Sequence, residues 1–180
     1  MDSAASETRT SAGSPGAAIL IVDDTPPNIG LLHAMLQPRG YQLFAASSGQ
    51  QALDIAERIQ PDLILLDVMM PGLDGFATCR ALKSHANTAD VPVIFITACS
   101  DSEDVARGFQ AGAADYLAKP IRMEELLARV QTQLQLRLGR QQELAAQAQL
   151  QAIVEAVRTG LLPTGATATL THQHASAGRP

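Results

Sequence analysis

Acidic, hydroxyl and ammonium side chains stand at the ends of aliphatic runs in this chain. Asp23 and Asp24 follow the run AAILIV, Asp67 follows LILL, Thr97 ends VPVIFIT, and Lys119 follows DYLA. If these runs are parallel strands, their carboxyl ends meet at one rim of a sheet, where ligands bind. Three carboxylates brought together there would raise one another's pKa values unless a cation neutralised them. We therefore expect a cation at this rim.

Mg²⁺ is the cation that suits this set of side chains. It prefers oxygen ligands and usually takes one or two carboxylates together with phosphate oxygens and water. A carboxylate can also act as a covalent phosphoryl acceptor. A metal, a lysine and a hydroxyl could then neutralise the charge on the transferred phosphoryl oxygens. The residue types therefore match a phosphoryl-transfer site.

Each of these residues also has a structural explanation when it is considered alone. Asp23 and Asp24 could favour the positive N-terminus of a following helix. Asp67 could be a turn residue before Pro71-Gly72. A threonine at a strand end, a lysine before proline, or a tyrosine in a strand is usually structural. The functional interpretation depends on their joint occurrence at successive strand ends, in chain order.

Five aliphatic runs alternate with four amphipathic segments between residues 17 and 121. We expect strands at 17–22, 41–46, 63–66, 91–97 and 115–118, and helices at about 26–37, 48–59, 73–84 and 102–111. Strands and helices that alternate at this length predict a parallel sheet with right-handed crossovers and helices on both faces. The nearly continuous aliphatic strands are typical of a sheet that is covered on both sides.

Residues at the ends of the expected helices fit known capping patterns. Thr25, which precedes proline, predicts an N-cap, and Ser48 with Gln51 predicts a capping box. Gly40 and Gly112 follow helical segments and predict left-handed terminators.

The segment from Ile121 to about Arg158 is expected to form one long helix. It contains no proline, and its only glycine is Gly139. Apolar residues keep helical spacing up to residue 138 and again at residues 150–157. A continuous helix here would be about 55 Å long at about 1.5 Å per residue, which is longer than the domain needs. Such a helix could pair with a second copy as a coiled coil, or it could be an exposed Gln- and Ala-rich helix without a partner.

The chain is expected to have four parts. These are a disordered leader at 1–16, a folded domain at 17–138, a helical extension at 139–158 and a disordered tail at 159–180.

Composition limits the classes of function. The chain has 180 residues, 46% of them hydrophobic, and a net charge of −5, which argues against a direct nucleic-acid interface. Cys79 and Cys99 stand in unrelated contexts, so we expect free thiols in a reducing compartment. No apolar run approaches about 18 residues, and the first residues do not form a secretory signal. We therefore expect a cytoplasmic protein without membrane insertion.

Four segments together resemble the receiver domain of response regulators in two-component signalling, over about residues 17–138. They are ILIVDDTPPN (19–28), LILLDVMMPGLDGF (63–76), VIFITA (93–98) and DYLAKP (115–120), and they occur in the family's order and spacing. The resemblance implies a flavodoxin-like, doubly wound (βα)5 parallel sheet with strand order 2-1-3-4-5 and, here, an extended fifth helix.

The resemblance also implies how phosphoryl group and metal would be bound. Asp67 would accept a phosphoryl group, as a 4-aspartylphosphate, from a histidine kinase or a histidine phosphotransfer protein. Asp24 and Asp67 would bind Mg²⁺ directly, together with the backbone carbonyl of Met69. Asp23 would act mainly through water.

Three further roles follow from the same resemblance. Lys119 and Thr97 would contact phosphoryl oxygens and complete the catalytic set. Tyr116 would turn inward when Thr97 moves, so that these two residues form the switch. The chain would then be a stand-alone, phosphorylation-controlled switch, not a turnover enzyme, with output through a partner or through a homodimer formed by the fifth helix.

Other classes of protein remain as alternatives. An aspartate-nucleophile phosphatase would place its nucleophile after the first strand as DxDx[TV], where this chain has DDTPPN. A nucleotide-binding Rossmann domain needs glycines there so that backbone amides can approach phosphates. The chain could also be the amino-terminal module of a longer kinase or cyclase.

Overall fold

The computed structural model describes residues 16–98 and 102–159. The expected leader and tail lie outside the described residues, apart from Gly16 and Thr159, and Cys99 also lies outside them. The boundaries predicted for these two terminal segments therefore stay predictions.

A five-stranded parallel sheet forms the centre of the domain. Its strands are β1 (Ala18–Val22), β2 (Gln42–Ala46), β3 (Leu63–Asp67), β4 (Val93–Thr97) and β5 (Asp115–Ala118), in the order β2-β1-β3-β4-β5. The flavodoxin-like, doubly wound fold class is thus confirmed. The direction in which strands are added reverses between β1 and β3, which is the position where open α/β sheets bind ligands.

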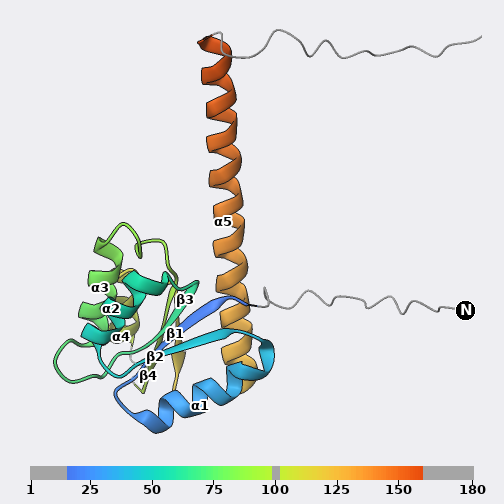
Figure 1. Cartoon of the computed structure of the whole chain (residues 1–180). Coiled ribbons are helices and arrows are strands. Elements are labelled where there is room, and N and C mark those ends of the chain that lie inside the picture. Colours follow the sequence, from blue (N-terminus) through green and yellow to red (C-terminus); the bar gives the residue numbers. More distant parts are fainter. Residues whose placement is uncertain (1–15, 99–101, 160–180) are drawn as a thin grey trace, which may run out of the picture. The chain divides into compact units, whose positions relative to one another are not determined.

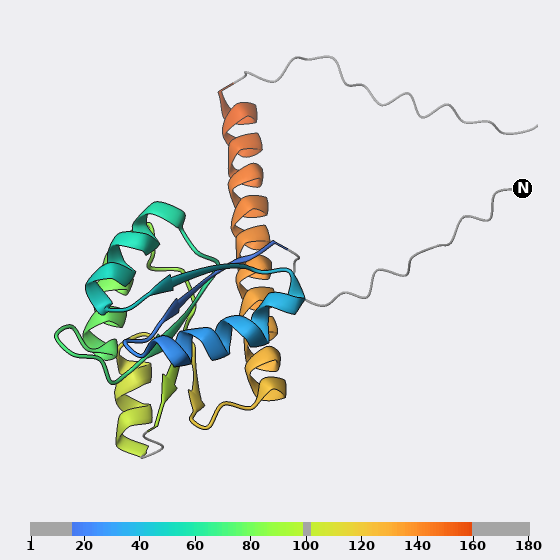
Figure 2. The same ribbon diagram turned by 60° about the horizontal axis from the view of Figure 1, so that its bottom comes forward.

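Helices cover both faces of this sheet. They are α1 (Pro26–Leu36), α2 (Gly49–Ile59), α3 (Gly75–Ser84), α4 (Ser102–Gln110) and α5 (Met123–Arg158), with a 3-10 turn η1 (Gln37–Arg39) after α1. Figures 1 and 2 show α1 and the first turns of α5 on one side of the sheet, and α2, α3 and α4 on the other. The expected helices and strands are all present, with bounds that differ by up to two residues.

Two hydrophobic cores lie on opposite faces, because successive side chains of a strand point to opposite sides. On β3, Leu63 and Leu65 belong to the core formed with α1 and α5, which we call the α1/α5 core. Ile64 and Leu66 belong to the core formed with α2 and α3, which we call the α2/α3 core. The residues of β3 and β4 are all buried, so the middle of the sheet is a rigid support for the residues at its rim.

The capping predictions are confirmed in part. The Ser48 side chain accepts a hydrogen bond from the Gln51 N–H at 3.3 Å. The Gln51 side chain, however, accepts from the Ser47 N–H at 2.7 Å and not from Ser48. Thr25 is the N-cap residue of α1 but makes no side-chain capping bond; its hydroxyl instead donates to Asp24 at 3.3 Å.

The glycine terminators are confirmed, and one helix start is corrected. Gly40 and Gly112 have φ values of 78° and 94°, in the left-handed region where glycine is favoured. Helix α3 begins at Gly75 and not at residue 73, because Asp74 is its N-cap. The Asp74 carboxylate accepts from the Ala77 N–H at 2.7 Å, which satisfies one of the free donors of the first turn.

Helix α5 is a single helix of 36 residues in the described part of the chain. Its early residues Leu126, Leu127, Val130 and Leu134 are buried in the α1/α5 core. Gly139 does not interrupt it. The described residues from 142 to 159 belong to a second compact unit, in which Leu150, Ile153 and other large apolar side chains are exposed. None of the described helices has the length and apolar character to cross a membrane.

Candidate active site

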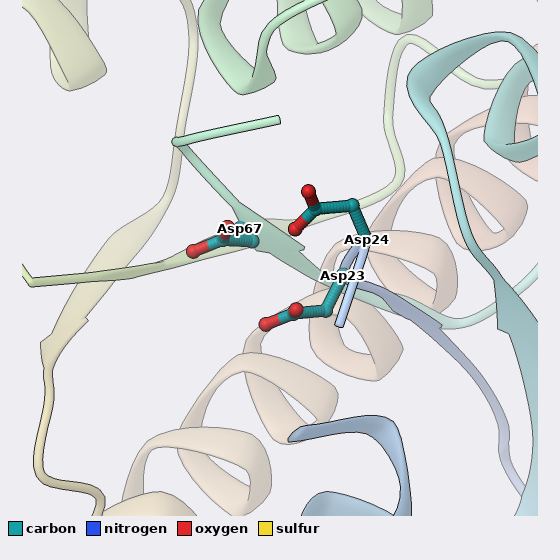
Figure 3. Close-up of side chains that lie close together, drawn as sticks. All are labelled: Asp23, Asp24 and Asp67. Carbon is teal, nitrogen blue, oxygen red and sulfur yellow. The ribbon is translucent and has the colours of Figure 1, made fainter. Parts of the chain in front are cut away.

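The three carboxylates predicted from strand ends lie together. Asp23 and Asp24 follow β1, and Asp67 is the last residue of the neighbouring strand β3, whose Leu66 is paired with Val22. One carboxylate oxygen from each residue lies within 4.8 Å of those of the others. Figure 3 shows the three side chains converging on the same space beyond the strand ends. The rim expected from the sequence is therefore present.

Burial makes this cluster unfavourable without a cation. Asp23 and Asp67 are 1% and 4% exposed, while Asp24 is exposed. Loss of solvation raises the pKa of Asp67, the hydrogen bond and charge of Lys119 act to lower it, and the charges of Asp23 and Asp24 raise it further. The net direction is upward, so a cation bound here would stabilise the ionised form of Asp67.

Lys119 connects two of the carboxylates. Its Nζ donates to Asp67 Oδ1 at 2.9 Å and to Asp23 Oδ2 at 3.1 Å. Burial by itself would lower the pKa of Lys119, but the hydrogen bonds and charges of Asp67 and Asp23 outweigh it and the pKa is raised. The ammonium therefore stays charged and neutralises part of the cluster. The peptide bond from Lys119 to Pro120 is cis, a feature that was not predicted from the sequence.

Asp23 has a further side-chain partner, Asn28, that was not predicted from the sequence. The side-chain amide of Asn28 donates to both carboxylate oxygens of Asp23, at 3.0 Å each. The backbone N–H of Thr25 donates to Oδ1 at 2.9 Å. Asn28 belongs to the segment DDTPPN, but its type gives no signal of a role until the first turn of α1 brings it back over the strand end.

Thr97 lies at the same rim but on the other side of the sheet. On β4, Phe95 belongs to the α2/α3 core and Ile96 to the α1/α5 core, so strand alternation directs Thr97 toward the α2/α3 side. Thr97 is 5% exposed and lines a small apolar pocket with Phe76, Phe95 and Tyr116. Its carbonyl oxygen accepts from the Lys119 N–H at 2.8 Å.

Tyr116, the predicted switch residue, lies between a ring and a guanidinium. The Phe109 ring meets it edge to face with centroids 6.5 Å apart. The Arg129 guanidinium lies 5.7 Å from the Tyr116 ring centroid and pairs with Asp115 at 2.7 Å and Glu125 at 2.9 Å. The structure thus places Thr97 and Tyr116 around one pocket, while the three carboxylates and Lys119 form the charged cluster.

Met69, predicted to offer its backbone carbonyl, follows Asp67 in the loop before α3. The residue is 65% exposed, and because Mg²⁺ prefers oxygen to a thioether sulfur, any contribution of Met69 to the metal would come from its main-chain carbonyl. The loop is closed by a hydrogen bond from the Gly75 N–H to the Val68 carbonyl at 3.0 Å.

The donor set fits Mg²⁺. Three carboxylates with one lysine leave an excess of negative charge, and all the candidate ligands are oxygens, as Mg²⁺ prefers. A bound Mg²⁺ would supply the charge that this group of buried acids lacks.

The sequence matches one protein-family model and is similar to several characterised proteins. The family model described as the response regulator receiver domain matches residues 19–131. Response regulator PleD of Caulobacter vibrioides is 47% identical over 116 residues, which are 64% of this chain and 26% of PleD. Protein PilH of Pseudomonas aeruginosa is 42% identical over 111 residues, which are 62% of this chain and 92% of PilH. The chain thus spans about a quarter of PleD and nearly all of PilH.

Solved structures show the same fold. The receiver domain of a sensor histidine kinase from Pseudomonas aeruginosa is 39% identical, with a TM-score of 0.63 over 66% of this chain and 98% of that one. A magnesium ion is coordinated in the active-site cleft of that domain. Chemotaxis protein CheY4 of Vibrio cholerae is 31% identical, with a TM-score of 0.63 over 65% of this chain and 98% of that one.

Proposed function

This chain belongs to the response regulator receiver family of two-component signalling, and from that premise we propose that it is a phosphorylation-controlled switch whose acceptor is Asp67. One observation carries the proposal: Asp67 ends the buried central strand β3, 2.9 Å from Lys119 and inside the carboxylate cluster.

An Asp67 oxygen would attack the phosphorus of a phosphohistidine. A P–O bond forms as the P–N bond breaks, and the imidazole nitrogen keeps the electron pair.

Asp24, Asp67 and the backbone carbonyl of Met69 would hold Mg²⁺, with Asp23 acting through water. The magnesium ion in the related receiver domain and the carboxylate cluster of this chain support that assignment. When bound, the metal supplies positive charge to the phosphoryl oxygens. The protein itself supplies the acceptor and positions it on a rigid strand.

Lys119 and Thr97 complete the site from neighbouring strands. The Lys119 ammonium already lies on Asp67, so it can move from the carboxylate to a phosphoryl oxygen with little displacement. Thr97 would donate its hydroxyl to another phosphoryl oxygen. Because Thr97 and Tyr116 line the same pocket, a movement of Thr97 toward the site would open space for the Tyr116 ring. That change would couple phosphorylation to the surface of α4 and β5.

The phosphoryl donor would be a histidine kinase or a histidine phosphotransfer protein in the cytoplasm. The chain would act as a phosphoacceptor and would not turn over external substrates. Its own carboxyl oxygen is consumed by the transfer and is regenerated only when the aspartyl phosphate is hydrolysed.

Labelling by a small phosphodonor tests the acceptor. Acetyl phosphate with Mg²⁺ should add one phosphoryl group to the wild-type chain, seen by intact-mass spectrometry, and none to Asp67→Asn. Asp74→Asn is the matched control, because Asp74 caps α3 and lies outside the cluster. Undiminished labelling of Asp67→Asn would exclude Asp67 as the acceptor.

Self-association through α5 is a second part of the proposal. Ala146, Leu150, Ile153 and Val157 follow the four-three-four spacing of a coiled-coil seam, and the last three are 48–62% exposed. The side chains next to them include Gln147, Gln149 and Gln151, which carry no charge that would repel a second copy. Sedimentation of the wild-type chain should show a dimer that Ile153→Glu disrupts and that Gln141→Glu, on the opposite face of the helix, preserves. A wild-type monomer at all concentrations would refute it.

A further inference from the structure

Hydrogen-bond donors already lie on both carboxylate oxygens of Asp23, and the one amide group of Asn28 is shared between them. A carboxylate has about four lone-pair sites on its two oxygens. Oδ1 accepts from the Thr25 N–H at 2.9 Å and from the Asn28 amide at 3.0 Å. Oδ2 accepts from the same amide at 3.0 Å and from Lys119 at 3.1 Å. Four contacts thus surround a side chain that is 1% exposed.

The other two carboxylates keep oxygens for a metal. Asp67 receives Lys119 on Oδ1, and Asp24 receives the Thr25 hydroxyl on Oδ1 at 3.3 Å. Among the described residues, no hydrogen-bond donor lies on Oδ2 of either Asp24 or Asp67. As far as the described residues are concerned, a metal can therefore bind Asp24 and Asp67 directly without displacing a donor, whereas at Asp23 it would meet donors on both oxygens.

Asn28 is held firmly in this position. Pro26 and Pro27 form the first two positions of α1, where their fixed φ angles favour the helix. The Asn28 N–H donates to the Thr25 carbonyl at 2.9 Å, which closes the first turn. The side-chain amide then points back over the end of β1, and both oxygens of Asp23 are within its reach.

From this geometry we propose that Asn28 is a positioning residue that determines metal specificity. By occupying both oxygens of Asp23, it keeps that carboxylate out of direct metal contact and leaves two carboxylates for the ion. Mg²⁺ binds through one or two carboxylates and retains several waters, whereas Ca²⁺ takes more oxygen ligands at longer distances. Asn28 thus favours Mg²⁺ over Ca²⁺ at this site.

The inference rests on the proposed metal site but not on phosphoryl transfer, so it is tested with metals alone. Dissociation constants for Mg²⁺ and for Ca²⁺ are measured by isothermal titration calorimetry on the full chain without a phosphodonor. Asn28→Ala releases Asp23, which can then bind the ion directly. The preference for Mg²⁺ over Ca²⁺ should fall by about tenfold, the size typical of changes to residues that orient metal ligands.

Two further variants make the test specific. Asn28→Leu has nearly the same shape as asparagine but cannot donate a hydrogen bond, so it should lose the same selectivity even if Asn28→Ala folds poorly. Asn87→Ala is the matched control, because Asn87 is exposed in the loop after α3 and should leave both constants unchanged.

The outcomes separate this inference from the proposed function. A wild-type chain that binds neither metal would refute both. If the wild-type chain binds Mg²⁺ but the two Asn28 variants weaken Mg²⁺ and Ca²⁺ equally, Asn28 is only a structural support for the loop and the inference is wrong. Unchanged constants in both variants would also overturn it, while leaving Asp67 as the acceptor.

Discussion

Gly75→Ala should disturb the candidate active site although Gly75 is not one of the clustered carboxylate residues. Gly75 is the first residue of α3 and packs against the end of β3, which carries Asp67. A Cβ built at residue 75 would lie 2.7 Å from Val68 Cα and even closer to the Asp67 carbonyl oxygen. Ordinary contacts of a Cβ begin at 3.4 Å. Since both neighbours are backbone atoms, α3 and the end of β3 must move apart by at least roughly 0.7 Å, the shortfall of the Val68 contact from an ordinary one.

The expected cost follows from that displacement. Overpacking of a close-packed region typically costs about 1–3 kcal/mol, so the free energy of unfolding of Gly75→Ala should fall by about 2 kcal/mol. Urea unfolding followed by circular dichroism measures this change. Because the shift moves the strand end that carries Asp67, the affinity for Mg²⁺ should weaken as well, which calorimetry measures.

Two other glycine substitutions provide a graded control. Gly30→Ala, in α1, meets no atom within 4 Å and should stabilise the fold by about 0.5–1 kcal/mol through helix propensity. In Gly108→Ala the added Cβ would lie 3.1 Å from the Phe95 ring. Its free energy of unfolding should therefore lie between those of Gly75→Ala and Gly30→Ala. If Gly75→Ala were as stable as Gly30→Ala, with unchanged Mg²⁺ affinity, the reasoning from close backbone approach would be refuted.

Three other substitutions or measurements test the energetics of the site and the fold. The pKa of Asp67 is raised in the folded protein, so the ionised carboxylate lowers the free energy of unfolding at pH values above this raised pKa. Below the usual value of 3.8 the carboxyl is protonated in both the folded and the unfolded chain, and this cost is absent. Asp67→Asn should therefore be more stable than wild type at pH 7 by urea unfolding, with the difference fading as the pH falls toward 3.8; a constant difference would contradict this. Burial raises the pKa of Cys79 to about 11, so in a Cys99→Ser background it should react with Ellman's reagent at pH 8 only after unfolding. Asp74→Ala should lose about 1 kcal/mol of stability with the α3 cap, and Asp74→Asn should keep it.

The sequence predicted the charged cluster well because its geometry follows from topology. Asp67 and the Asp23-Asp24 pair come directly after buried aliphatic runs, and parallel strands bring such positions to one edge whatever the details of packing. The strand order itself did not follow from periodicity. It came from the resemblance to receivers, because alternation of strands and helices predicts a parallel sheet without saying which strand lies at its centre.

Features that depend on side-chain contacts across turns were missed. Asn28 meets Asp23 only because α1 starts two residues before it, and Arg129 meets Asp115 across 14 positions of chain. The same limit applies to Asp74, whose capping role depends on where the loop after β3 ends. Hydrophobic periodicity locates elements, but it does not locate the polar contacts that form when two elements meet.

The acceptor and the switch residues of the proposed switch lie on opposite faces of the sheet. Asp67 shares its strand face with Leu63 and Leu65 of the α1/α5 core, while Thr97 lies on the side of Phe95 and the α2/α3 core. Substitutions on α1 would therefore adjust the proposed chemistry at the carboxylates without touching the pocket that Tyr116 lines, and substitutions on α4 would adjust the proposed output surface without touching the carboxylates. In a switch of the proposed kind, changes on one face of the sheet would alter the choice of signalling partner, and the phosphoryl chemistry on the other face would stay the same.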